Sequence, residues 1–151
     1  RWVSAGEATS DVQVLTDEEK HDSRPRESDL LWWKDTPQGE SYGKAVAKVR
    51  GKESLFQHAR LHQSRPAPTL SANSHVFTHW SECRKLTYRE WKRLGSFPDD
   101  YHAKTDKIGK YMIGMSVPPK MTEQVARAVC EQWLNVNYSE LSNDNQAKNT
   151  D

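Results

Sequence analysis

Apolar residues recur with helical spacing in two stretches of the second half of the chain. The first stretch begins at Thr87, and Glu90 three residues later completes a capping box that would start a helix. Trp91 and Leu94 then lie three residues apart on one face. Gly95 stands where a left-handed residue would end the helix. The pattern predicts a helix of about two turns.

The second stretch follows Pro118-Pro119, which suits the first turn of a helix because the amide that proline lacks has no intrahelical partner there. Apolar side chains recur every three or four residues between Met121 and Trp133, and charged residues fall between them. We therefore predict a second, amphipathic helix that runs to about Asn135.

The rest of the chain gives weaker local signals. Ser4 to Glu27 shows no sustained apolar period and is expected to be a loop or a disordered lead-in. A bulky apolar anchor at Leu30 to Trp33 precedes a turn, and Lys44 to Val49 is compatible with a helix or a strand. Four further expectations are an extended segment at 64–68, a short strand at 69–72, a turn at Asn73-Ser74 and a polar loop at 102–110.

Composition limits the size of the core and the cellular setting. Hydrophobic residues make up 34% of the chain, charged residues 28%, and mean hydropathy is -0.96, so a core can form only where apolar residues cluster. No apolar run approaches the roughly 18 residues of a membrane span, and the N-terminus lacks a signal-peptide pattern. We expect a soluble, cytoplasmic protein, in which Cys83 and Cys130 are reduced packing residues.

Charge is distributed unevenly along the chain. Residues 44–120 hold 15 Lys and Arg against 6 Asp and Glu, whereas residues 1–43 hold 5 against 10 and residues 121–151 hold 2 against 5. A basic middle between acidic ends suits a surface that faces phosphates, since Lys and Arg gain affinity by releasing counterions from nucleic acid. A solvated charged face would give the same bias, so charge alone leaves both interpretations open.

Two blocks in the second half resemble the last two sequence motifs of the DNA cytosine-5 methyltransferases. The first runs from Arg84 to Tyr101 and the second from Tyr111 to Met121, and the resemblance as a whole extends from about Arg65 to Leu134. The residues that carry it are Thr69, Leu70, Arg84, Leu86, Thr87, Arg89, Glu90, Arg93, Leu94, Phe97, Pro98, Tyr101, Tyr111, Ile113, Gly114, Val117 and Pro118.

The resemblance implies an α+β fragment. A small, irregular, β-containing target-recognition part would be followed by C-terminal helices that complete a Rossmann-like α/β methyltransferase domain. The implied division is a flexible lead-in at 1–28, the target-recognition part at 29–83, the C-terminal portion of the catalytic domain at 84–136 and a disordered tail at 137–151.

The resemblance also implies two groups of site residues. Thr69 and Leu70 would press on the DNA backbone near a nucleotide flipped out of the duplex, and the candidates for phosphate contacts are Arg65, Lys85, Arg89, Lys92 and Arg93. The wall of the S-adenosylmethionine pocket would be formed by Gly114, Met115, Ser116 and Val117, with Met115 at a position where the family usually has Asn. For Arg84 and Glu90 we favour an internal network of ion pairing and helix capping.

The chain lacks the family's catalytic elements. Methyl transfer requires a thiolate that attacks cytosine C6, an acid near N3 and a bound methyl donor. Neither Cys83, after Glu82, nor Cys130, after Val129, follows a proline as the family's nucleophile does, and the glycine-bearing cofactor loop has no counterpart. We therefore expect no catalytic residue here and no activity of the chain alone.

The expected partners are double-stranded DNA and an N-terminal catalytic portion on the same parent chain or on a separate one. The expected setting is a bacterial or phage restriction-modification methyltransferase that uses S-adenosylmethionine. Two alternatives stay open: a non-catalytic DNA-binding module derived from a methyltransferase, and a structural remnant of a split or truncated gene.

Three metal-capable side chains occur at four-residue steps, at His75, His79 and Cys83. The segment is β-prone, and in a strand such steps place the side chains about 13 Å apart, too far for shared coordination. We expect no metal site here.

Overall fold

A computed structural model describes residues 2–12, 14–52, 54–55, 58–72 and 76–134. The chain forms two units, Arg1–Ser116 and Val117–Asp151. Each unit is described by itself, and the predicted turn at Asn73-Ser74 and the predicted tail at 137–151 lie outside the described residues.

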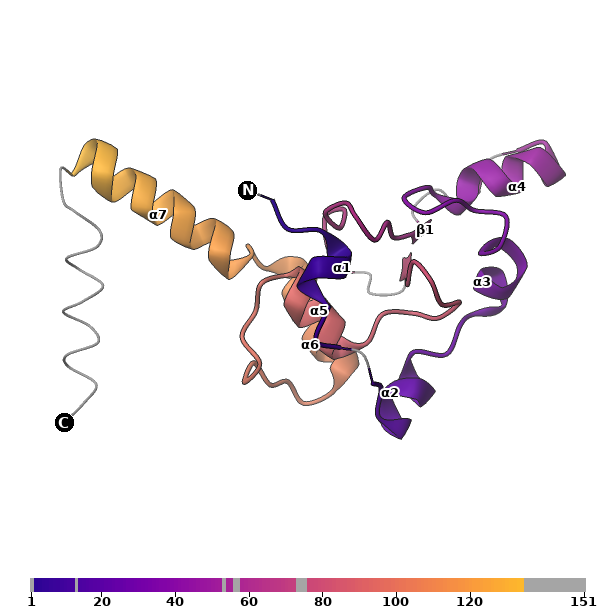
Figure 1. The fold of residues 1–151 in the computed structure, drawn as a ribbon, viewed down its shortest axis with the longest axis horizontal. Helices are drawn as coiled ribbons and strands as arrows, with labels where there is room; N and C mark the ends of the chain where they lie inside the picture. Colours follow the sequence, from indigo (N-terminus) through magenta and orange to yellow (C-terminus); the bar gives the residue numbers. More distant parts are fainter. Residues whose placement is uncertain (1, 13, 53, 56–57, 73–75, 135–151) are drawn as a thin grey trace. The chain divides into compact units, whose positions relative to one another are not determined.

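Short helices connected by long irregular segments make up the first unit (Figure 1). Two strands of two residues each, β1 and β2, pair in parallel, with Ala59 opposite Phe77 and Arg60 opposite Thr78. The elements in chain order are α1 (Ala5–Ala8), α2 (Asp17–Asp22), α3 (Glu27–Trp32), α4 (Tyr42–Arg50), β1 (Ala59–Arg60), β2 (Phe77–Thr78), α5 (Tyr88–Leu94) and α6 (Asp106–Met115). This confirms an α+β fragment that has several helices and little strand.

The main core lies around α5 and the two strands. Trp91 of α5 is fully buried and packs 6.2 Å, centroid to centroid, from Phe77 of β2. Burial of a side chain of this size contributes about 3 to 5 kcal/mol when judged by truncation to Ala. The buried members of this core are Ala5, Leu61, Val76, Phe77, Trp80, Leu86, Trp91 and Ile113.

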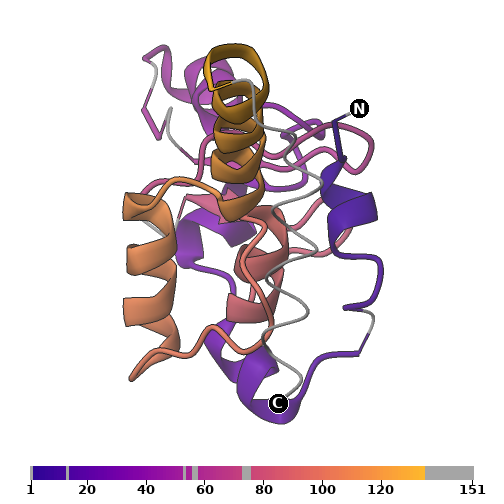
Figure 2. The ribbon, with the colours of Figure 1, turned by 90° about the vertical axis from the view of Figure 1, so that its left-hand side faces the viewer.

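Helix α6 packs beside α5 (Figure 1 and Figure 2). Thr105 caps α6, since its hydroxyl accepts a hydrogen bond from the amide of Ile108. Gly109 allows the close approach, because a Cβ there would come within 2.5 Å of the Tyr88 ring. Lys110 is buried at the same contact and donates from Nζ to the carbonyl oxygen of Leu86, 2.8 Å away.

A second, smaller core joins α3 and α4 around Trp32, Tyr42, Ala45 and Val46. Arg60 connects it to the main core, because its guanidinium donates to the carbonyl oxygens of Trp33, Thr36 and Trp80. The same group lies 3.8 Å from the centroid of the Trp33 ring, a cation–π contact.

The opening stretch corrects the expectation of an unstructured loop. It forms α1 and α2, which are capped by Ser4 and by a Thr16–Glu19 capping box. Ala5 is 1% exposed in the main core, and its amide donates to the carbonyl oxygen of Arg65 at 2.8 Å. Helices this short are only marginally stable on their own, so they depend on caps and on packing against the rest of the unit. Their few residues also show too little apolar period to be recognised in the sequence.

Predictions for the second half meet mixed outcomes. The helix that begins at Thr87 is confirmed with its capping box, and so is a helix after Pro118-Pro119. The left-handed residue after α5 is Ser96, with φ of 58°, and not Gly95, whose φ is -82°.

Two other expectations for this region are wrong. Residues 69–72 form no strand, because the strand pairing takes place at 59–60 and 77–78. The expected loop at 102–110 instead contains the start of α6, where the buried residues are Gly109 and Lys110, which carry no apolar signal. The question left open at 44–49 is decided in favour of a helix, α4.

Candidate functional site

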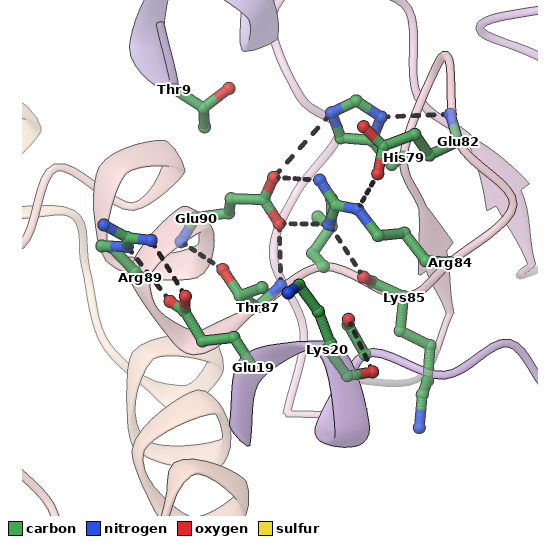
Figure 3. A network of polar contacts seen from close by, with 12 residues as sticks. Thr9, Glu19, Lys20, His79, Glu82, Arg84, Lys85, Thr87, Arg89 and Glu90 are labelled. Carbon is green, nitrogen blue, oxygen red and sulfur yellow. Dashed lines mark hydrogen bonds and ion pairs between the residues drawn. The ribbon is translucent and has the colours of Figure 1, made fainter. Parts of the chain in front are cut away.

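A buried ion pair joins the segment before α5 to the first turn of that helix (Figure 3). Arg84 donates from both terminal nitrogens to the two carboxylate oxygens of Glu90, each at 2.8 Å. Glu90 also accepts from the amide of Thr87 at 2.8 Å, and its own amide donates to the Thr87 hydroxyl at 3.1 Å. The expected role of Arg84 and Glu90 as an internal pairing and capping network is confirmed.

The environment shifts the ionisation of each member of this network. Burial alone would raise the pKa of Glu90, but the hydrogen bonds and charge of Arg84 outweigh it, so this pKa is lowered. Burial acts first on His79 and the positive charge of Arg84 adds to it, which lowers the pKa of His79 to about 4. The ring of His79 stacks on Trp80 with centroids 3.8 Å apart, so a neutral imidazole is part of the packing.

Two of the candidate phosphate contacts on α5 are paired within the protein. Arg89 donates to both carboxylate oxygens of Glu19 in α2, at 3.1 and 2.9 Å. Arg93 is bonded to Asp11 and Asp99, which raise the pKa of its guanidinium further. Their positive charges are therefore largely matched by carboxylates.

A third candidate, Lys92, is buried and its ammonium donates to the backbone carbonyl oxygen of Asp99. The ammonium also lies 5.2 Å from the centroid of the Tyr88 ring. A lysine held in this way fixes the turn after α5.

Arg65 and Lys85 present a different picture. Arg65 is exposed and Lys85 is half-buried, and neither side chain forms an ion pair with any residue that the structure describes. Figure 3 shows the Lys85 side chain pointing away from the buried network. Within the described part of the chain, neither positive charge is matched by a carboxylate.

The segment that carries Thr69 and Leu70 lies against the first unit's core. Leu70 is partly buried against that core, as is Ala67, whereas Thr69 is exposed. Its continuation meets α6: a Cβ on Gly114 would lie 2.1 Å from the carbonyl oxygen of Ser71 and 2.4 Å from the amide nitrogen of Ala72. The structure thus brings the predicted DNA-contacting segment next to the predicted cofactor segment.

The four predicted cofactor residues lie at the end of α6 and just beyond. Met115 is 67% exposed, Ser116 is exposed, and Val117 begins the second unit. Two hollows of about 430 and 410 Å³ occur in the described part of the chain. Neither of these two hollows is lined by Gly114 to Val117.

In the second unit, helix α7 (Pro119–Trp133) is amphipathic. All of its residues are described, and none is buried. Large apolar side chains at Met121, Val125, Val129 and Trp133 are exposed at four-residue steps, which places them along one side of the helix.

Sequence reasoning missed Arg60 and Lys110, which both serve the packing of the first unit. Burial lowers the pKa of the Lys110 ammonium and also lowers that of the Arg60 guanidinium. A buried Lys at the core-facing position of a helix carries no hydrophobic signal, and only the docked helices reveal its partner, the carbonyl oxygen of Leu86.

Among the described residues, no group of three or more His, Cys, Asp or Glu side chains could hold a metal ion. Within that part of the chain no helix is long and apolar enough to span a bilayer.

The sequence profile of the C-5 cytosine-specific DNA methylases matches residues 6–131, and the chain belongs to this family. Curated relatives agree with this assignment. The chain is 39% identical over 93 residues to a protein of Methanocaldococcus jannaschii assigned as a type II methyltransferase, which covers 60% of this chain and 30% of the relative. It is 35% identical over 102 residues to the type II methyltransferase M.BbvI of Brevibacillus brevis, which covers 64% of this chain and 26% of the relative.

A third relative is much shorter than these two. The type II methyltransferase M.AquIB of Picosynechococcus is 34% identical over 92 residues, and the match covers 52% of this chain and 66% of the relative. The chain thus spans less than a third of the first two relatives but two thirds of this one. No solved structure matches the chain.

Proposed function

We propose that this chain is the C-terminal part of a DNA cytosine-5 methyltransferase, in which it recognises the DNA target and closes the S-adenosylmethionine pocket. The observation that carries the proposal is the contact between Gly114 and the Ser71–Ala72 backbone, because it unites the two segments that the family resemblance marks for DNA and for cofactor. In this proposal residues 29–83 are the target-recognition part and residues 84–136 complete the catalytic domain, between a lead-in at 1–28 and a tail at 137–151.

The DNA side of the proposal rests on charge and exposure. Arg65 and Lys85 would contact phosphates, because their charges are unmatched by described carboxylates. Thr69 and Leu70 would contact the backbone near the flipped nucleotide. Arg89, Lys92 and Arg93 belong to the same basic segment, but their internal bonds place their contribution below that of Arg65 and Lys85.

The cofactor side rests on the exposed end of α6. Gly114, Met115, Ser116 and Val117 would form one wall of the pocket for S-adenosylmethionine, which supplies the methyl group in this family's reaction. Met115 offers a thioether and no amide, so contact at this wall would come from apolar surface and from the backbone. The other walls and the nucleophilic Cys would come from an N-terminal portion that completes a Rossmann-like domain.

Helix α7 supports an assembly with such a portion. Its apolar side chains are exposed on one side of a helix that buries none of its described residues, and an amphipathic helix needs a partner for its apolar face. The match covers 30% and 26% of the first two relatives. The unmatched part of each relative is therefore more than twice as long as the matched part, which is long enough for a catalytic domain. We propose that α7 packs on that domain.

Methylation of DNA by a reconstituted enzyme tests the proposal. The chain is mixed with an N-terminal methyltransferase portion that carries a Pro-Cys element and a glycine-bearing loop, and transfer of labelled methyl groups to duplex DNA is measured. We expect activity only from the mixture. Absence of activity with a portion shown to bind this chain would favour the alternative of a non-catalytic DNA-binding module.

Salt-dependent binding tests the DNA side independently of catalysis. We expect the double variant Arg65→Glu, Lys85→Glu to bind mixed-sequence duplex DNA more weakly, and the slope of log affinity against log salt to fall by up to about 2, since each lost phosphate contact contributes roughly 0.9.

The double variant Lys104→Glu, Lys107→Glu is the matched control, because it reverses the same number of charges on two exposed residues that lie outside residues 29–83 and have no assigned DNA contact. Equal slopes for the Arg65→Glu, Lys85→Glu variant and the wild type would remove Arg65 and Lys85 from the DNA interface.

A further inference from the structure

The end of helix α6 meets the Ser71–Ala72 segment backbone to backbone. Gly114 is the penultimate residue of α6. It contacts Ser71 and Ala72, which directly follow Thr69-Leu70 in the sequence. The space that a side chain would need at this position is occupied by the carbonyl group of Ser71 and the amide nitrogen of Ala72, at 2.1 to 2.4 Å from an ideal Cβ.

These distances leave no room for any other residue. Non-bonded heavy atoms settle at about 3.5 to 4 Å, so a methyl group on Gly114 would require the segment to retreat by more than about 1 Å. Backbone atoms cannot rotate away as the end of a flexible side chain can. Either Ser71–Ala72 or the end of α6 must move.

Helix α6 is the more firmly held of the two partners. Ile113 is 2% exposed in the main core, and Lys110 is anchored to the carbonyl oxygen of Leu86. Gly109 sits under the Tyr88 ring. The Ser71–Ala72 segment has no regular secondary structure and is exposed or half-buried, so a clash would displace the segment.

We infer that Gly114 is a positioning residue: its missing side chain sets the location of the Thr69–Leu70 segment relative to the end of α6. The inference rests on the proposed function, in which Thr69 and Leu70 contact DNA, and it adds a role for Gly114 other than lining the cofactor pocket. Through this contact the DNA-contacting segment and the cofactor segment keep one relative placement.

Gly114→Ala in the whole chain tests the inference with two readouts. Amide NMR signals of residues 69–72 are expected to shift, and affinity for mixed-sequence duplex DNA is expected to fall by about 10-fold, which corresponds to about 1.4 kcal/mol of lost contact. Thermal unfolding is followed in parallel to show that the variant folds.

Gly109→Ala is the matched control. It makes the same substitution on the same helix, but its Cβ meets the Tyr88 side chain and not the 69–72 segment. It is expected to lower the unfolding temperature while signals of residues 69–72 and DNA affinity stay as in the wild type.

Unshifted 69–72 signals in Gly114→Ala would overturn the inference, and so would shifted signals with unchanged DNA affinity. If that variant fails to fold, nuclear Overhauser contacts in the wild type decide the question: contacts between the Gly114 α protons and the Ala72 amide proton are expected, and their absence would overturn the inference. A wild-type chain that binds no duplex DNA would instead refute the proposed DNA contact, even where the Overhauser contacts are present.

Discussion

Helices α5 and α7 are both amphipathic, but only one of them is packed within its own unit. Helix α5 has seven residues, three of which are buried, and its first turn is held by the capping box and by Arg84. Helix α7 has fifteen residues, all described, and buries none of them. The longer helix thus has fewer of its apolar side chains removed from water.

The difference shows which part of the chain is complete in itself. The charged side chains of α5 find partners inside the first unit, among them the carboxylate of Glu90, which pairs with Arg84. The apolar side of α7 is exposed, and we propose that it packs on an N-terminal catalytic portion. The same family motif region therefore contains one helix that stabilises this chain and one that we propose stabilises an assembly.

The largest expected effect is on assembly through α7. Val125→Asp places a charge in the middle of the exposed apolar side, and burying an unpaired carboxylate is costly. We expect loss of detectable binding to the N-terminal portion, measured by co-purification and calorimetry, with unchanged unfolding of the first unit.

Gln124→Asp is the matched control for this substitution. It adds the same charge at the neighbouring exposed position, which points about 100° away around the helix. It should preserve assembly. If Val125→Asp also preserves assembly, α7 does not dock through this side.

The next largest effect concerns the packed helix. Glu90→Ala leaves the guanidinium of buried Arg84 without its main partner and removes the reciprocal bond of the capping box. Breaking a buried pair in this way costs about 3 to 5 kcal/mol, which urea denaturation would measure as a lower free energy of unfolding.

An exposed ion pair on α7 provides the comparison for the buried pair of Arg84 and Glu90. Arg127 and Glu123 are 3.4 Å apart and partly exposed, and Glu123→Ala should cost about 0 to 0.5 kcal/mol. Similar losses for Glu90→Ala and Glu123→Ala would contradict the contrast between the two helices.

The smallest expected effect is the pH dependence that His79 gives to the first unit. Its pKa is lowered from 6.5 to about 4 by burial and by Arg84, so below pH 6.5 the unfolded chain takes up a proton that the folded chain does not. Stability is full above pH 6.5 and falls between pH 6.5 and about 4, by at most about 3 kcal/mol.

Glu82, Arg84 and Glu90 also face His79, and the lowered pKa of Glu90 adds acid sensitivity of its own. The comparison is therefore between wild type and His79→Gln, with the free energy of unfolding measured at each pH. Between pH 6.5 and 4, the free energy of unfolding should fall less steeply with decreasing pH in the variant than in the wild type. Parallel curves would show that His79 titrates normally.

Local sequence determined the parts of the structure that depend on neighbouring residues. The capping box at Thr87 and Glu90 specifies the start of α5, because both of its hydrogen bonds join residues three apart. Pro118-Pro119 and the four-residue apolar period specify α7. The motif residues also assign the family, which the match over residues 6–131 confirms.

Only the tertiary structure decided which residues pair over long distances. Arg89 and Arg93 look like free cations in the sequence, yet Glu19 and Asp11 reach them from segments about 70 and 80 residues earlier. Besides the apolar Ile113, the buried residues of α6 are Gly109 and Lys110, whose burial is explained only by the docking of the helix on α5.

The contact at Gly114 illustrates the same limit. A glycine in the sequence shows that a side chain is missing and does not show what occupies its place; here the Ser71–Ala72 backbone does, more than 40 positions earlier. Caps and periodicity are short-range and readable from the chain, whereas ion pairs and close backbone approaches depend on how distant segments pack.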